Sequence, residues 1–110
     1  MPNNNKFILH GDQWVANISG FKVSLTDKCM TVFSGDNELE GVMRFSDGLS
    51  DLNESSFTYN ELGSRTAILL PDDSGHVEIV QCGNDLHLSR YNPNGVVVEK
   101  LQVTSTLKPI

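Results

Sequence analysis

The sequence is poor in several residues that would indicate common classes of protein. Only 2 of its 110 residues are cysteine, 7% are aromatic, and Trp14 is the single tryptophan. No apolar run approaches the roughly 18 residues of a membrane-spanning helix. The first residues lack the basic and apolar regions of a secretory signal peptide. We therefore expect a cytoplasmic protein that does not enter a membrane, with Cys29 and Cys82 as reduced thiols.

Basic residues are also scarce. The chain has 8 Lys and Arg residues against 14 Asp and Glu residues, which gives a net charge of -6 and an isoelectric point near 4.8. A chain with this balance is repelled by the phosphates of nucleic acid and by an anionic membrane surface. We therefore expect neither nucleic acid nor a membrane among its partners.

What the sequence does contain is a repeated pattern of alternating apolar and polar residues, interrupted by Gly, Asp and Asn about every eight to twelve positions. Phe21, Val23 and Leu25, for example, alternate with Lys22 and Ser24. Alternation of this kind is typical of antiparallel strands with one buried and one solvated face. The same pattern assigns four more residues to the buried face: Phe33, Leu39, Met43 and Phe45.

No helical periodicity persists beyond a turn or two, so we predict an all-β fold. The prediction is a single-domain antiparallel meander of about nine or ten short strands, forming a barrel or a two-sheet sandwich. Residues 6–110 make up the domain, and residues 1–5 form a disordered tail. The gap from 46 to 56 is a candidate crossover and the one place for a short helix. The predicted strands are 6–10, 13–18, 21–26, 29–34, 38–46, 57–62, 65–70, 76–82, 85–91 and 96–104.

Short turns predict the register between strands, because a tight loop must place apolar side chains opposite one another. Three turns, at residues 11–12, 35–37 and 83–84, meet this condition. The resulting partners are Leu9 with Trp14, Phe33 with Leu39, Cys29 with Met43, Ile79 with Leu88, and His76 with Tyr91. After the turn at 92–95, the last strand fits its neighbour only with a β-bulge.

Residues 36–47 approach the spacing of a calcium-binding loop. The carboxylates of Asp36, Glu38, Glu40 and Asp47 would stand at the first, third, fifth and twelfth positions, with Gly41 at the sixth. Such a loop also requires Asp or Asn at the third and fifth positions, Glu at the twelfth and flanking helices. We therefore interpret the segment as a hairpin that does not bind calcium.

No other group of residues indicates a metal site or a catalytic set. The predicted register separates His76 and His87 too widely to share one ion with Glu78. Cys82 and His87 are the only neighbouring thiol and base, and no strained turn or orienting group accompanies them. The sequence thus favours a protein without a cofactor, a metal ion or catalytic residues.

Two classes of function remain. The favoured class is a small acidic interaction protein, such as an inhibitor, an immunity factor or an adaptor, that presents carboxylates to a basic protein partner. Its candidate binding residues are Glu38, Glu40, Asp47, Asp51 and Glu54. The alternative is a barrel, possibly enzymatic, that holds a small ligand in a cavity. Its candidate residues are Trp14, Tyr59, Tyr91 and His87.

Self-association is compatible with the interaction class. The segments 65–70 and 96–104 both contain apolar runs that an isolated edge strand would tolerate poorly. We therefore predict that a homo-oligomer, if one forms, buries one of these two strands as its edge.

Overall fold

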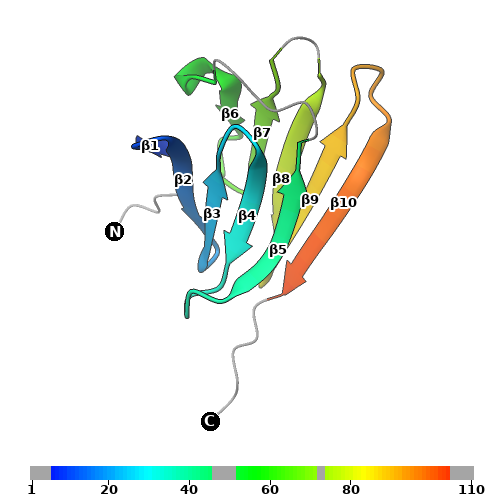
Figure 1. The fold of residues 1–110 in the computed structure, drawn as a ribbon. Coiled ribbons are helices and arrows are strands. Elements are labelled where there is room, and N and C mark those ends of the chain that lie inside the picture. The colour runs from blue at the N-terminus through cyan, green and yellow to red at the C-terminus, as the bar shows by residue number, and fades with distance from the viewer. Residues whose placement is uncertain (1–5, 46–51, 72–73, 105–110) are drawn as a thin grey trace.

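The computed structural model describes residues 6–45, 52–71 and 74–104, and its fold is all-β (Figure 1). Ten antiparallel strands form two sheets of five, and each sheet is a meander in chain order. A single turn of 3-10 helix, η1 (Glu54–Ser56), precedes β6. The predicted tail at residues 1–5 lies outside the described ranges. The first sheet contains β1 (Ile8–His10), β2 (Gln13–Ile18), β3 (Phe21–Leu25), β4 (Cys29–Phe33) and β5 (Leu39–Arg44). The second sheet contains β6 (Phe57–Tyr59), β7 (Arg65–Leu69), β8 (His76–Cys82), β9 (Asp85–Tyr91) and β10 (Val97–Thr104).

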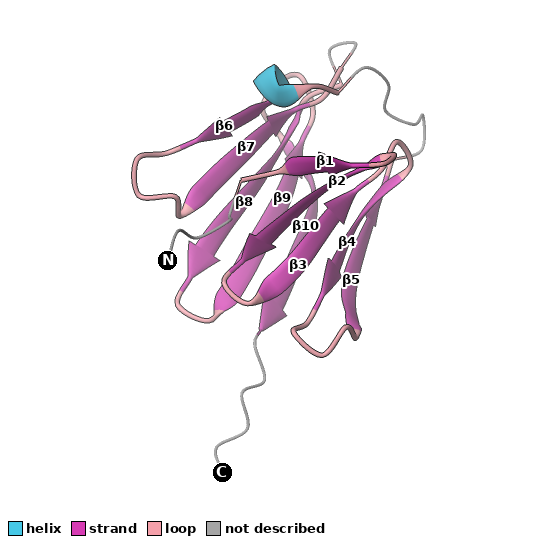
Figure 2. Cartoon of the chain, turned by 90° about the vertical axis from the view of Figure 1, so that its left-hand side faces the viewer, coloured by secondary structure: helices cyan, strands magenta, loops and turns pink. Residues whose placement is uncertain are grey.

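The two sheets face each other as a sandwich, and they do not close into a barrel (Figure 2). The predicted all-β meander is confirmed, and of its two proposed forms the sandwich is the correct one. The chain passes from the first sheet to the second between β5 and η1, inside the gap that the sequence marked as a crossover. Across the described ranges, no helix is long and apolar enough to cross a membrane.

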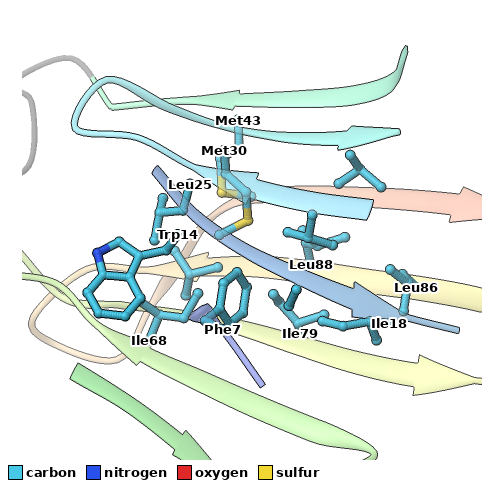
Figure 3. Close-up of a cluster of buried hydrophobic side chains, with 14 of the residues drawn as sticks. Phe7, Trp14, Ile18, Leu25, Met30, Met43, Ile68, Ile79, Leu86 and Leu88 are labelled. Carbon is cyan, nitrogen blue, oxygen red and sulfur yellow. The ribbon is translucent and has the colours of Figure 1, made fainter. Parts of the chain in front are cut away.

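The space between the sheets is filled by apolar side chains from both (Figure 3). Leu25, Met30 and Met43 from the first sheet and Ile79 and Leu88 from the second are each at most 1% exposed. A fully buried side chain of this size contributes roughly 1.5–3 kcal/mol through the hydrophobic effect. The alternation seen in the sequence therefore supplies the core of the sandwich.

An aromatic cluster fills the side of the core next to β1 and β6. The ring of Phe57 lies 4.8 Å from that of Phe7 and 5.0 Å from that of Trp14, measured between centroids. Trp14 is only 9% exposed. Its large apolar surface therefore belongs to the core.

Most of the predicted register is confirmed. Leu9 pairs with Trp14, Ile79 with Leu88, and His76 with Tyr91. The predicted bulge in the last strand is present as well, between Val97 and Glu99 of β10.

One predicted pair is wrong. Cys29 lies opposite Arg44, and Met43 instead pairs with Met30. The cause is a bulge in β5, where Leu39 pairs with Phe33, Gly41 pairs with Val32, and Glu40 between them is one extra residue.

Because of the same bulge, the buried face that the alternation predicted is wrong at one end of β5. An extra residue inverts the phase of a strand, so residues before the bulge point the opposite way from residues after it. Met43 and Phe45 are buried, whereas Leu39 is 56% exposed and its partner Phe33 is only half-buried. Leu39 and Phe33 were therefore assigned to the wrong face.

Of the two predicted edge strands, only one is an edge. β10 lies at the edge of the second sheet, whereas β7 is flanked by β6 and β8. The segment 65–70 therefore has no free edge to offer a second copy of the chain.

Polar side chains join the two sheets along both sides of the sandwich. On the β1 and β6 side, the Phe7 amide donates a 2.8 Å hydrogen bond to the Tyr59 hydroxyl. On the β5 and β10 side, Arg90 Nη1 donates to the Arg44 carbonyl at 3.3 Å, and the guanidinium lies over the Phe45 ring.

Glycine permits a close approach between β5 and β10. A Cβ atom on Gly41 would lie 2.7 Å from the Leu101 side chain. The two strands therefore meet where β5 has no side chain.

Candidate functional site: an acidic hollow

A hollow of about 260 Å³ lies at one end of the sandwich. The turns that follow β2, β4 and β8 meet there with the end of β10, at the lower end of the molecule in Figure 1. Residues from both sheets line this hollow, and most of them are polar. We call it the acidic hollow, and its lining residues are Ser19, Gly20, Phe21, Ser34, Gly35, Asp36, Glu38, Glu40, Asn84 and Thr104.

The turn between β4 and β5 supplies the carboxylates and is held by its own hydrogen bonds. The Ser34 amide donates to the Glu38 carbonyl at 2.8 Å, and the Glu38 amide donates to the Ser34 hydroxyl at 3.2 Å. Asn37 takes the left-handed backbone conformation, with φ of 63°, which Asn tolerates better than most residues. Asp36 and Glu38 are thus presented by a turn of defined shape.

The bulge in β5 determines where Glu40 lies. Leu39 and Gly41 are paired with β4, and Glu40 between them is the additional residue. Bulges commonly redirect a side chain in this way. Glu40 consequently shares the hollow with Asp36 and Glu38.

The first and second sheets are joined beside the hollow. Ser19 Oγ donates to the Gly83 carbonyl at 3.4 Å, and this contact connects the turn after β2 with the turn after β8. Ser19 has φ of 53° and Gly20 has φ of 84°, as the two central positions of a tight type I′ hairpin turn require. The mouth of the hollow is therefore built from both sheets.

The lining carries three carboxylates and neither Lys nor Arg. Acidic residues that line one hollow, with no Lys or Arg in the same lining, create a negative potential that attracts positive charge. Serine, threonine and asparagine side chains around them add hydrogen-bonding groups. The arrangement suits the ammonium or guanidinium group of a basic side chain.

The sequence predicted five acidic binding residues; the structure describes three of them and brings two of these three together. Glu38 and Glu40 line the acidic hollow. Glu54 lies in η1, at the opposite end of the sandwich in Figure 1. Asp47 and Asp51 fall outside the described residues.

The four residues proposed for a ligand cavity do not surround a common space. Trp14 is packed in the core, and the Tyr59 hydroxyl accepts the hydrogen bond that joins the sheets. His87 pairs with Val80, and Tyr91 pairs and stacks with His76, on the outer face of the second sheet. None of the four lines the acidic hollow.

The outer face of β9 carries an acid, an imidazole and a hydroxyl in a row: Asp85, His87 and Ser89. In the part of the chain that the structure describes, no side-chain hydrogen bond joins these three residues. Asp85 instead accepts a 3.3 Å hydrogen bond from Gln102. The row therefore lacks the contacts of a catalytic triad.

Within 6–45, 52–71 and 74–104, no group of three or more His, Cys, Asp or Glu side chains is arranged to hold a metal ion. Cys29 is half-buried and Cys82 is exposed, and both are free thiols.

Sequence reasoning missed the residues that complete the hollow from other turns, chiefly Ser19, Asn84 and Thr104. Each lies at or next to a strand end whose turn is visible in the sequence. What the sequence does not give is the packing of the two sheets, which brings these turns to one place.

Comparison of the chain with protein-family models, with curated proteins and with solved structures yields no match. Its function must therefore be inferred from its own residues.

Proposed function

We propose that this protein is a non-catalytic binding domain that takes up a basic segment of a protein partner in the acidic hollow. The supporting observation is the gathering of Asp36, Glu38 and Glu40 in one hollow that has no cationic residue in its lining. A lysine or arginine of the partner would enter between these carboxylates. The overall charge of -6 would draw the partner in before contact.

The alternative of a small-ligand barrel gains no support from the fold, because its four candidate residues do not surround a common space. The interaction proposal includes the cytoplasmic location expected from the sequence. It assigns no cofactor and no reaction to the chain.

Charge reversal at the hollow tests this proposal. The probe is an oligoarginine peptide carrying a fluorophore, titrated at low ionic strength, where exposed charges are least screened. We expect the double variant E38K/E40K to weaken binding by about tenfold, because two attractive contacts become repulsive. Raising the salt concentration should weaken binding to the wild-type protein.

The matched control is D12K/E61K, which changes the net charge by the same amount at two exposed positions outside the hollow lining. We expect it to retain most of the affinity. An equal loss in both variants would mean that the peptide responds to net charge alone, and the acidic hollow would not be the site.

A further inference from the structure

The end of the sandwich opposite the acidic hollow carries exposed apolar side chains. Leu69 is 65% exposed, and Val96, Val97 and Val98 are 58%, 36% and 55% exposed. Among the described residues, these are four of the eight large hydrophobic residues with such exposure. A concentration of apolar surface in one place is typical of an interaction site.

Strand pairing joins these residues into a row across the outer face of the second sheet. Leu69 of β7 pairs with His76 of β8, His76 with Tyr91 of β9, and Tyr91 with Val97 of β10. The rings of His76 and Tyr91 are stacked, with centroids 4.5 Å apart and planes 9° apart. Leu69, His76, Tyr91, Val96, Val97 and Val98 together form what we call the apolar surface.

Carboxylates and permanently cationic groups are absent from this row, in contrast to the next row along the same strands. There Glu78 of β8 forms an ion pair with Arg65, and Ser89 pairs with Lys100. Within the described residues, the four side chains of this row therefore bring no carboxylate against a second copy of this acidic chain.

A hollow of about 450 Å³ adjoins the apolar surface. Leu69 and His76 belong to both, and Leu70, Pro71, Pro93 and Gly95 add further lining. Val96 directly follows Gly95 at its rim. Exposed valines thus lie beside this hollow, whose remaining lining residues are Gly75 and Asn92.

We propose that a second copy of this chain docks on the apolar surface and forms a two-fold symmetric dimer. A symmetric contact requires each copy to carry both the protruding part and the hollow that receives it. The order of residue types along the row is also symmetric, because an aliphatic residue, Leu69 or Val97, stands on each side of the two rings. Two copies related by a two-fold axis therefore place aliphatic groups against aliphatic groups and rings against rings.

The position of β10 leaves room for a second copy. β10 is the edge strand of the second sheet, and its close approach to β5 is at Leu101, three residues beyond Val98. Figure 1 shows the first half of β10 at the outside of the molecule.

The dimer should be weak, because the apolar surface is small. A standard interface uses about 20–30 residues on each side, whereas the apolar surface and its hollow contribute far fewer. We expect association to appear only at high protein concentration.

Sedimentation velocity of the full chain, from roughly ten micromolar to one millimolar protein, tests this proposal. The wild-type protein should shift from monomer toward dimer across this range. The variant L69K should remain monomeric, because it places a charge in the row of each copy. V96K changes the residue that precedes β10, and it should also remain monomeric. It takes the place of L69K in the test if L69K does not fold.

Leu62→Lys is the matched control, since Leu62 is 88% exposed in the turn between β6 and β7. It makes the same change of charge away from the apolar surface and should dimerise like the wild type. A wild-type protein that is monomeric at every concentration would overturn the proposal. Unchanged dimerisation of folded L69K, or growth into open-ended polymers, would overturn it as well.

Discussion

The two ends of the sandwich are made from the same kinds of element and have opposite chemistry. β9 (Asp85–Tyr91) runs between them: Asn84, just before it, lines the acidic hollow, and Asn92, just after it, lines the hollow beside the apolar surface. One end gathers three carboxylates, whereas the other gathers leucine, valine and proline around a pair of stacked rings. The strands thus supply a common scaffold, and the turns determine what each end can bind.

The backbone also differs between the two ends. Gly20 and Gly83, in the turns of the acidic end, have positive φ, and a Cβ atom on either would meet nothing within 4 Å. Gly75, at the apolar end, has φ of +100°, and a Cβ atom there would lie 1.9 Å from the Tyr91 carbonyl oxygen. At Gly75 the backbone of the apolar end is therefore in close contact with β9, whereas Gly20 and Gly83 at the acidic end, like Gly95 at the apolar end, lie in open turns.

Replacing a glycine with alanine should give the largest difference in stability between the two ends. We expect G75A to lower the free energy of unfolding by about 3 kcal/mol or more, because neither backbone segment can yield without disturbing the pairing around Tyr91. G20A should lower the free energy of unfolding by only about 1 kcal/mol, because alanine must adopt a left-handed conformation there. Urea denaturation of both variants measures the difference, and equal losses would contradict the contrast in backbone packing.

The two proposed binding activities should be separable. E38K/E40K should lose affinity for oligoarginine by about tenfold and still dimerise, because neither residue belongs to the apolar surface. L69K should lose dimerisation and bind the peptide as the wild type does. If either variant impaired both activities, the two ends would not act as independent sites.

Removing the hydrogen bond between Phe7 and Tyr59, at the side of the sandwich, should lower stability and leave binding at both ends unchanged. Tyr59→Phe removes the hydroxyl that accepts the Phe7 amide, and we expect a loss of about 1 kcal/mol. Peptide binding and dimerisation should persist. Loss of either activity in folded Y59F would show that the ends depend on this link.

The same residue predicts an alkaline pH dependence. Burial raises the pKa of Tyr59 above its ordinary value of 10.0, and the hydrogen bond from Phe7 offsets part of that rise. The unfolded chain therefore loses this proton first, so stability should fall as the pH rises from about 10 toward the raised pKa. Y59F should lack this part of the decline, and Y91F should retain it.

The sequence predicted the ten strands and four of the five residue pairs correctly, because short turns and alternating residues act locally. It failed at β5, where the pattern of Leu39, Met43 and Phe45 is consistent with an uninterrupted strand. The bulge is not encoded in alternation alone. The residue next to the bulge, Gly41, lies against Leu101 of β10, which is 60 residues away in the chain, and no local pattern reveals that contact.

The candidate site was predictable in part for the same reason. Glu38 and Glu40 are close in the sequence and remain close in the structure. Glu54 is also near in the sequence, but the crossover carries η1 to the opposite end. The apolar surface crosses strands whose order the predicted meander gives correctly, but the edges of the sheet were predicted only in part: of the two proposed edge strands, only β10 is one.

The central claim is that the acidic hollow receives a basic side chain, and residue-resolved NMR tests it most directly. Oligoarginine is titrated into ¹⁵N-labelled wild-type protein, and amide shifts are followed for every assigned residue. The predicted result is that shifts concentrate at Ser19, Ser34–Glu40, Asn84 and Thr104, and that they vanish in E38K/E40K. Shifts spread evenly over all acidic residues, or centred on Glu54 and Glu61, would contradict the proposed site.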